Sequence, residues 1–240
     1  MFLLAHRGAS RDAPENTLEA FDEAVTQRAD GVELDAMVCG SGEVVVCHDE
    51  RLERLTGRGG DVRRLGYSDL RQRDVGTRLG FSRARIPLLD EVLERLPSHF
   101  LINIELKCDT AEDHGLAVKV AELVKRRRLS ERVLVSSFNA LCLFRMARAA
   151  PGLRRGYLID EGCSFPLHAY ALSPLVSRFS VHPFHEYITP ARMRTWAAAG
   201  LKVVTWTVDD VARARRLREM GVAYLITNHP RRLREGLAGD

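Results

Sequence analysis

Two short hydrophobic segments carry acidic side chains at alternate positions. Residues 31–37 read Gly-Val-Glu-Leu-Asp-Ala-Met, and residues 101–107 read Leu-Ile-Asn-Ile-Glu-Leu-Lys. Alternate residues of a strand point to opposite faces, so Glu33 and Asp35 share a polar face, and Glu105 lies on the polar face of the second segment. Buried carboxylates are costly unless they are paired or bound to a cation, so inward-facing acids would indicate a metal site. The alternative is two half-exposed strands of an antiparallel sheet whose polar face meets water.

The segments with these acids belong to a longer alternation of strands and helices. Repeated strand–helix units predict a parallel sheet, and the eight such units in this chain predict a closed (β/α)₈ TIM barrel. The predicted strands are Phe2–Ala5, Gly31–Met37, Phe100–Lys107, Arg132–Phe138, Leu153–Ile159, Arg178–His182, Leu201–Val208 and Val222–Asn228. The predicted helices include Thr17–Arg28, Leu88–Leu96, His114–Arg128, Thr189–Ala199 and Asp209–Glu219, with N-caps expected at Ser10 or Asn16, at Thr189 and at Asp209.

One segment interrupts this alternation between the second and third predicted barrel strands. Residues 39–42, Cys-Gly-Ser-Gly, predict a hairpin turn, and the alternating strand Glu43–Cys47 follows it. A loop-rich insertion at about residues 50–87 precedes the next helix. Long insertions at one end of a barrel tend to be functional. We therefore expect one barrel domain over residues 1–240 with a short insertion near its active end.

Composition narrows the classes of partner. The net charge of +4 and the pI near 8.9 fit a protein that handles small anions, and the arginine runs read as solvated helix faces, so we expect no nucleic-acid partner. The five cysteines show no CxxC or zinc spacing, which indicates reduced thiols in a cytoplasmic protein. No run approaches the roughly 18 apolar residues of a membrane span, and the first apolar run is too short for a signal peptide. We expect no stable membrane insertion.

Active sites of (β/α)₈ barrels lie at the carboxyl ends of the strands. Those ends and the hairpin bring together His6, Arg7, Glu33, Asp35, His48, Asp49, Glu105, Lys107, Ser137, Phe138, His182, Trp206 and Asn228. Each has a structural alternative: His6 could cap a strand, His48 could be a loop histidine, Glu105 and Lys107 could form a structural ion pair, and Trp206 could pack in the core. Their convergence on one face favours a metal-assisted site for an anion.

The residue types at these strand ends indicate phosphodiester cleavage. Carboxylate oxygens favour a hard cation, Mg²⁺ or Ca²⁺, over Zn²⁺. Such an ion neutralises charge on a phosphoryl group, and Arg7 and Lys107 can donate to the same oxygens. Two histidines titrate near neutrality, so one can take a proton from the nucleophile while the other protonates the leaving alkoxide.

The chain resembles the glycerophosphodiester phosphodiesterase family along almost its whole length, most closely the compact bacterial cytosolic members. The segments that carry the resemblance are His6–Ser10, Pro14–Phe21, Val32–Asp35, Val45–Asp49, Asn103–Lys107, Ser136–Asn139, Val204–Val208 and Ile226–Pro230. The resemblance implies a distorted (β/α)₈ barrel that hydrolyses glycerophosphodiesters to sn-glycerol 3-phosphate and an alcohol with Mg²⁺ or Ca²⁺. Its implied roles are metal ligands at Glu33, Asp35 and Glu105, an acid–base pair at His6 and His48, phosphate contacts at Arg7 and Lys107, and pocket walls at Phe138 and Trp206.

Two features depart from the family pattern. The hairpin turn often reads Thr-Lys-Asp-Gly in the family and reads Cys-Gly-Ser-Gly here, which preserves the glycine geometry. His182, His185 and Tyr187 match no assigned position, and we interpret His182 as a structural histidine. The identity of the alcohol and of the metal, the direction of the histidine relay, cyclic-phosphate formation against direct water attack, and the oligomeric state stay open.

Two other functions compete with this one. A lysophospholipase D acting on single-chain lysophospholipids would need an apolar groove, whereas the insertion is rich in Arg and Gly. A catalytically silent barrel that binds a phosphorylated ligand would usually have lost a histidine or a metal acid, and this chain has kept them.

Overall fold

The computed structural model describes residues 1–108, 110–160 and 176–239, and the predicted barrel is present in them. The parallel strands follow the order β1-β9-β8-β7-β6-β5-β4-β2, and pairing of β1 with β2 closes the ring. The strands of the sheet are β1 Phe2–His6, β2 Gly31–Val38, β3 Val44–Val46, β4 Leu101–Leu106, β5 Val133–Ser137, β6 Arg154–Ile159, β7 Ser180–Pro183, β8 Lys202–Thr205 and β9 Tyr224–Thr227. The predicted barrel strands are confirmed, with ends that differ by a few residues.

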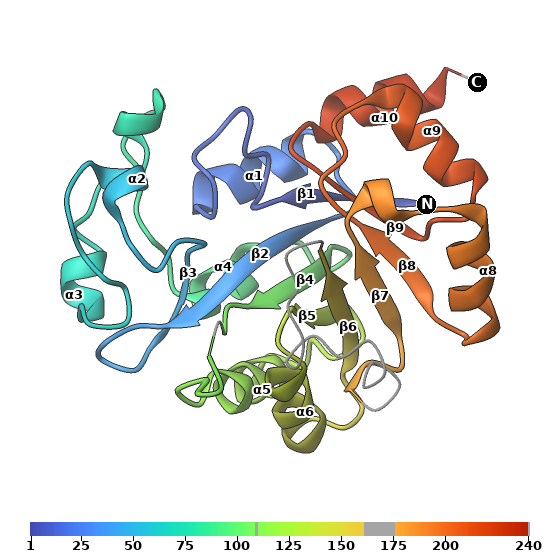
Figure 1. Ribbon diagram of the computed structural model, residues 1–240. Helices are drawn as coiled ribbons and strands as arrows, with labels where there is room; N and C mark the ends of the chain where they lie inside the picture. The colour runs from blue at the N-terminus through green and yellow to red at the C-terminus, as the bar shows by residue number, and fades with distance from the viewer. Residues whose placement is uncertain (109, 161–175, 240) are drawn as a thin grey trace.

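Helices cover the outside of the ring (Figure 1). The α-helices are α1 Leu18–Thr26, α2 Glu53–Thr56, α3 Tyr67–Leu70, α4 Leu89–Arg95, α5 Leu116–Arg126, α6 Ala140–Ala149, α8 Pro190–Ala198, α9 Val211–Glu219 and α10 Pro230–Ala238; the 3₁₀ helices are η1 Thr77–Leu79 and η3 His185–Tyr187. The helix expected after β6, together with Cys163, falls in residues 161–175, outside the described residues.

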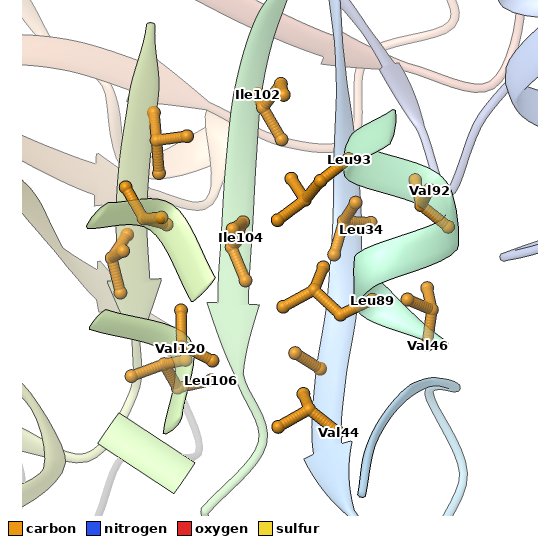
Figure 2. Close-up of a cluster of buried hydrophobic side chains, with 14 of the residues drawn as sticks. Leu34, Val44, Val46, Leu89, Val92, Leu93, Ile102, Ile104, Leu106 and Val120 are labelled. Atoms are coloured by element: carbon orange, nitrogen blue, oxygen red, sulfur yellow. The ribbon is translucent and has the colours of Figure 1, made fainter. Parts of the chain in front are cut away.

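Apolar and polar residues alternate in β2 and β4, which gives each strand an apolar outer face and a polar inner face. Leu34 of β2 and Ile104 of β4 pack in one cluster with Leu89 of α4 (Figure 2). Their neighbours Glu33 and Asp35 point the other way and are only 3% and 1% exposed. Because β2 lies between two parallel partners, β1 and β4, the interpretation as half-exposed antiparallel strands is wrong.

The hairpin and the insertion extend from the end of β2. β3 pairs with β2 in antiparallel orientation, and the turn is closed by the Cys39 amide donating to the Glu43 carbonyl at 2.9 Å. The insertion has a hydrophobic cluster that includes Leu52, Leu70 and Ile86. Figure 1 shows α2 and α3 beyond β3, at one side of the ring. This arrangement brings the insertion next to the carboxyl ends of β1 and β2.

In two helices the N-cap lies one residue after the position expected from the sequence. Thr189 caps α8 as expected. Thr17 caps α1 by accepting from the Ala20 amide, and Asp210 caps α9 by accepting from the Arg213 amide. Asn16 and Asp209 therefore lie just outside their helices. Their side chains are directed instead toward the strand ends, which matters for the site.

The described cysteines at positions 39, 47, 108 and 142 are buried and carry free thiols. Among the described residues, no helix is both long and apolar enough to cross a bilayer.

Candidate active site

A pocket opens at the carboxyl end of the barrel and gathers most of the residues singled out from the sequence. Asp35 is not a lining residue of this pocket, but it belongs to the same acid cluster as Glu33 and Glu105. The pocket is lined by His6, Arg7, Glu33, His48, Asn103, Glu105, Lys107, Ser136, Phe138, Leu158, Trp206 and Ile226. The tertiary structure thus joins residues that lie up to 220 positions apart in the chain, since His6 and Ile226 line one pocket.

The floor of this pocket is an acid cluster. Each of Glu33, Asp35 and Glu105 offers an oxygen, and these oxygens lie within 4.8 Å of one another. β2 and β4 pair in register, so Asp35 is directly opposite Glu105. Burial, followed by the charges of Asp35 and Glu105, raises the pKa of Glu33 well above its ordinary value. Three ionised carboxylates at this spacing require positive charge between them.

Two basic side chains supply part of that charge. Arg7 Nε lies 3.2 Å from Asp35 Oδ2, and Lys107 Nζ lies 2.9 Å from Glu105 Oε1. Burial would raise the pKa of Asp35, but the charges of Arg7 and Lys107 outweigh it and lower that pKa. Asp35 Oδ1 is buried without a hydrogen-bond partner among the described residues. An all-oxygen set with one unsatisfied oxygen fits a hard divalent cation such as Mg²⁺ or Ca²⁺.

Asp35 is held by a residue that the sequence marked only as a possible helix cap. Asn16 Nδ2 donates to Asp35 Oδ2 at 2.8 Å, and Asn16 Oδ1 accepts from the Asp35 amide. Asn16 and Arg7 both have left-handed backbones, with φ of +58° and +55°. Non-glycine residues adopt this region rarely, and such outliers persist where the surrounding structure enforces them, often at functional sites.

His6 ends β1 and is anchored by the residue that follows the neighbouring strand β9. Its Nδ1 lies 2.7 Å from Oδ1 of Asn228, the residue that follows β9. Its Nε2 lies 4.0 Å from Glu33 Oε2 and so faces the acid cluster. Burial and the neighbouring Arg7 charge lower the pKa of His6 below its ordinary value.

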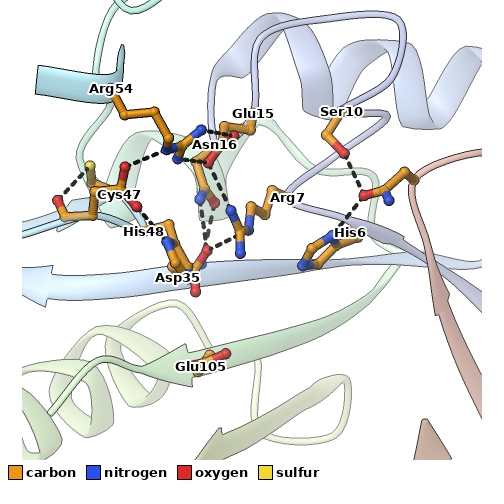
Figure 3. A network of polar contacts seen from close by, with 12 residues as sticks. His6, Arg7, Ser10, Glu15, Asn16, Asp35, Cys47, His48, Arg54 and Glu105 are labelled. Carbon is orange, nitrogen blue, oxygen red and sulfur yellow. Dashed lines mark hydrogen bonds and ion pairs between the residues drawn. The ribbon is translucent and has the colours of Figure 1, made fainter. Parts of the chain in front are cut away.

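His48 follows β3 and is anchored by a network of ion pairs that runs through the insertion (Figure 3). His48 Nδ1 lies 2.6 Å from Asp49 Oδ1, and Asp49 Oδ2 accepts from Arg54 Nε at 2.6 Å. Arg54 also donates through both terminal nitrogens to Glu15. Glu15 in turn accepts from Arg7 at 2.9 Å. The network therefore links the second histidine to the arginine beside the acid cluster.

The side of the pocket away from the acids is apolar and aromatic. The rings of Phe138 and Trp206 meet edge to face, with centroids 5.6 Å apart and planes at 90°. Trp206 Nε1 donates to the His182 carbonyl at 2.9 Å, which fixes the indole. Leu158 and Ile226 complete this wall. A charged floor and an aromatic wall can orient a ligand that has one anionic and one less polar end.

The other residues that the sequence analysis singled out, His182, His185, Tyr187 and Ser137, do not line the pocket. His182 is fully buried, its Nε2 contacts Ser180 Oγ at 3.0 Å, and it does not line the pocket, so its interpretation as a structural histidine is supported. His185 and Tyr187 lie in η3 and are absent from the lining residues. Ser137 bonds to the Leu106 carbonyl and is directed away from the pocket.

Sequence reasoning missed several polar partners of the site. Asn103 and Ser136 line the pocket, and Asn103 Nδ2 donates to Ser136 Oγ at 3.1 Å. Asn103 shares the polar face of β4 with Glu105, which was a usable signal. Arg54 carried no such signal, because only the folded insertion brings it to Asp49.

A closed (β/α)₈ barrel with an acid cluster, two anchored histidines and two basic side chains defines a class of hydrolase site for phosphorylated substrates. Residues 6–232 match the model of the glycerophosphoryl diester phosphodiesterase family, and the chain belongs to this family.

Several known proteins are similar over their whole length. A glycerophosphodiester phosphodiesterase of Caldanaerobacter subterraneus is 36% identical, covering 96% of this chain and 95% of that protein. The structure of a phosphodiesterase from Oleispira antarctica, in complex with the product sn-glycerol-3-phosphate, has a TM-score of 0.89 at 28% identity, covering 100% of this chain and 97% of that one. A glycerophosphodiester phosphodiesterase structure from Thermotoga maritima has a TM-score of 0.78 at 30% identity, covering 98% and 97%.

Proposed function

We propose that this glycerophosphodiester phosphodiesterase hydrolyses its substrates to sn-glycerol 3-phosphate and an alcohol with a divalent cation and two histidines. The observation that carries the proposal is the convergence of the acid cluster, His6 and His48 on one pocket. The similarity to a phosphodiesterase that holds sn-glycerol-3-phosphate supports the substrate class. The partner is a small molecule, and we expect the enzyme to act in the cytoplasm.

Glu33, Asp35 and Glu105 are the residues that would hold Mg²⁺ or Ca²⁺. A bound divalent cation supplies electrostatic stabilisation to a phosphoryl group as negative charge develops on it. Lys107 and Arg7 lie beside the same acids, so their N–H groups can donate to the remaining phosphoryl oxygens. The floor of the pocket thereby orients the phosphodiester toward the two imidazole rings.

The two histidines divide the proton transfers. His6 Nδ1 contacts a neutral amide, and its Nε2 faces the acids, so this ring suits the base that takes a proton from the nucleophile. His48 Nδ1 contacts the Asp49 carboxylate, whose negative charge compensates a positive ring. His48 therefore suits the acid that protonates the leaving alkoxide. The nucleophile is either water or the neighbouring glycerol hydroxyl.

Phe138 and Trp206 provide the wall against which the organic part of the substrate packs. The pocket that these perpendicular rings line has a volume of only about 80 Å³, which suits a short alcohol better than a long acyl chain. The exposed large hydrophobic residues among the described ones are Met1, Phe2, Val118 and Phe144, and none of them lines the pocket. No feature of the described pocket favours the lysophospholipase D alternative.

The test is release of glycerol 3-phosphate from a panel of glycerophosphodiesters, measured with Mg²⁺, with Ca²⁺ and with chelator. We expect metal-dependent turnover that falls by about 10²- to 10⁴-fold in His6→Ala and in His48→Ala. His99→Ala, at the opposite end of the barrel, is the control and should keep wild-type activity. Near-normal activity of both active-site variants would contradict the proposal. Turnover of lysophosphatidylcholine alone would favour the lysolipid activity, and metal-supported binding without turnover the silent barrel.

A further inference from the structure

A hydrogen-bonded chain of three side chains leads from the β8–α9 loop to the candidate base. Asn228 Oδ1 lies 2.7 Å from His6 Nδ1. Asn228 Nδ2 donates to Asp209 Oδ2 at 2.7 Å on its other side. Asp209 Oδ1 also accepts from the backbone amide of Asn228, at 2.8 Å, and from Thr227 Oγ1, at 2.9 Å. His6, Asn228 and Asp209 thus form one line of polar contacts across β1, β9 and the loop after β8.

The hydrogen bonds that link Asp209, Asn228 and His6 can have only one donor-to-acceptor direction. An ionised carboxylate can accept but cannot donate, so the NH₂ group of Asn228 must face Asp209 and its carbonyl oxygen must face His6. Ser10 Oγ donates to the same carbonyl oxygen at 3.0 Å, which reinforces this orientation. A carbonyl oxygen is purely an acceptor, so the neutral His6 ring must carry its proton on Nδ1. Its Nε2 lone pair is then directed toward the pocket.

The carboxylate of Asp209 is well suited to accept the hydrogen bond from the Asn228 side chain. Burial alone would raise the pKa of Asp209, but the hydrogen bonds from Asn228 and Thr227 outweigh it and lower that pKa. Asp209 is therefore a permanent acceptor. Its neighbour Asp210 is exposed and caps α9 through the Arg213 amide, so the two adjacent acids have separate tasks.

We propose that Asp209 is a positioning residue that, through Asn228, fixes the tautomer of His6 so that Nε2 is free to accept a proton. The effect on rate rests on the proposed function, in which His6 is the base, whereas the effect on the tautomer does not. The structural alternative is that Asp209 merely ties the end of β9 to the β8–α9 loop.

The test compares Asp209→Asn with Asp210→Asn, two isosteric changes at adjacent positions. In Asp209→Asn, the new oxygen can still accept from the backbone amide of Asn228, which cannot reverse its polarity. The new NH₂ group then faces the Asn228 side chain. That side-chain amide is forced to rotate, so its NH₂ group meets His6 Nδ1 and drives the ring proton to Nε2.

The tautomer is measured by long-range ¹H–¹⁵N NMR correlations of histidine rings in the full chain with Mg²⁺ supplied, at a pH where the ring is neutral. The His6 signals are identified by their loss in His6→Ala. We expect Nδ1–H in the wild type and in Asp210→Asn, and Nε2–H in Asp209→Asn. We expect kcat to fall about 10²-fold or more in Asp209→Asn with KM changed less than threefold, and to stay near wild type in Asp210→Asn.

A second pair of variants keeps the outcome interpretable if Asp209→Asn folds poorly. Asn228→Ala removes the acceptor and should give a mixture of both tautomers, while Ser10→Ala removes only the reinforcing donor and should keep Nδ1–H with a rate loss of less than tenfold. An Nδ1–H ring in folded Asp209→Asn or in Asn228→Ala would overturn the proposal. So would rate losses that follow thermal stability equally in the Asp209 and Asp210 variants. A changed tautomer with an unchanged rate would support the positioning role and instead contradict His6 as the base.

Discussion

The two candidate catalytic histidines are anchored through the same ring nitrogen by opposite kinds of partner. His6 belongs to a barrel strand, and its Nδ1 contacts the neutral amide of Asn228. The carboxylate of Asp209 contacts that amide in turn and does not touch the ring directly. His48 lies outside the ring after β3, and its Nδ1 contacts the Asp49 carboxylate directly. A neutral partner favours an uncharged ring, and a charged partner tolerates a positive one. In the proposed mechanism, this difference suits His6 to the role of base and His48 to the role of acid.

The two anchors also differ in exposure. The His6 anchor is built from strand ends and half-buried loops of the barrel itself. The His48 anchor depends on Arg54 of the insertion, whose side chain is 46% exposed. Solvent and salt screen exposed ion pairs, so we expect the second anchor to be the weaker and more adjustable one. We therefore expect the barrel to supply the more rigid half of the site and the insertion the more adjustable half.

The largest effect is expected where the two halves meet, at Asp35. Asp35→Asn removes a candidate cation ligand and the partner of Arg7, so turnover should fall by about 10³-fold or more, together with cation affinity. Turnover assays and calorimetric titration with Mg²⁺ measure both. Asp22→Asn, which affects only an exposed pair with Arg95, should change neither. Wild-type Mg²⁺ affinity in Asp35→Asn would remove Asp35 from the site.

A change of leaving group separates the two histidines. A 4-nitrophenyl ester of glycerol 3-phosphate releases a stable phenolate and needs little protonation. His48→Ala should therefore lose about 10²-fold or more on glycerophosphocholine but less than tenfold on the nitrophenyl ester, whereas His6→Ala should lose about 10²-fold on both. Steady-state rates on the two substrates decide the matter. The reverse pattern would exchange the roles of acid and base.

A smaller effect is expected from the outer part of the His48 anchor. Arg54→Met removes the donor to Asp49 and Glu15, so kcat/KM should fall about tenfold. The difference in kcat/KM between the variant and the wild type should shrink in high salt, because salt weakens the ion pairs of the wild type. Arg51→Met is the matched control, since its side chain is 78% exposed and pairs only with Glu53 among the described residues. Equal rates for the Arg54 and Arg51 variants would show that the insertion does not support His48.

The smallest effect concerns a third histidine, His182, which lies outside the pocket and whose Nε2 contacts the neutral hydroxyl of Ser180. Burial lowers the pKa of His182 to about 3, from an ordinary value of 6.5. Below pH 6.5 the unfolded chain takes up a proton that the folded chain refuses, so stability falls as the pH falls. The expected cost is about 0.7 kcal/mol between pH 7 and pH 6. Urea unfolding at both pH values measures the free energy of unfolding, and His182→Gln should lose that part of its pH dependence. An identical fall in the variant would contradict the lowered pKa of His182 as its cause.

The sequence was a strong guide to the barrel and its acids. The alternation of Glu33 and Asp35 with apolar residues predicts a two-faced strand, and the folded chain buries both faces. Leu34 of the apolar face is labelled in Figure 2, and Asp35 of the polar face is labelled in Figure 3. The eight strand–helix units predict closure of the ring, which is confirmed. Such patterns are local, with periods of two and 3.6 residues, so the sequence displays them directly.

The sequence was a weaker guide to the partners that orient the site. Asn16 and Asp209 were expected to cap helices, and both expectations were wrong by one residue, because Thr17 and Asp210 take those places. A shift of one position at a helix start redirects a side chain entirely. Nothing in the sequence around Arg54 indicated its contact with Glu15, 39 residues away.

The amino-acid sequence by itself thus determined the barrel and the acid cluster, and it predicted the two histidines that line the pocket, because strand alternation and strand-end position depend on neighbouring residues. The tertiary structure alone decided which partner holds Nδ1 of each histidine and that Nε2 of His6 faces the acid cluster. For His6 that partner is supplied from elsewhere in the ring and lies 222 residues along the chain.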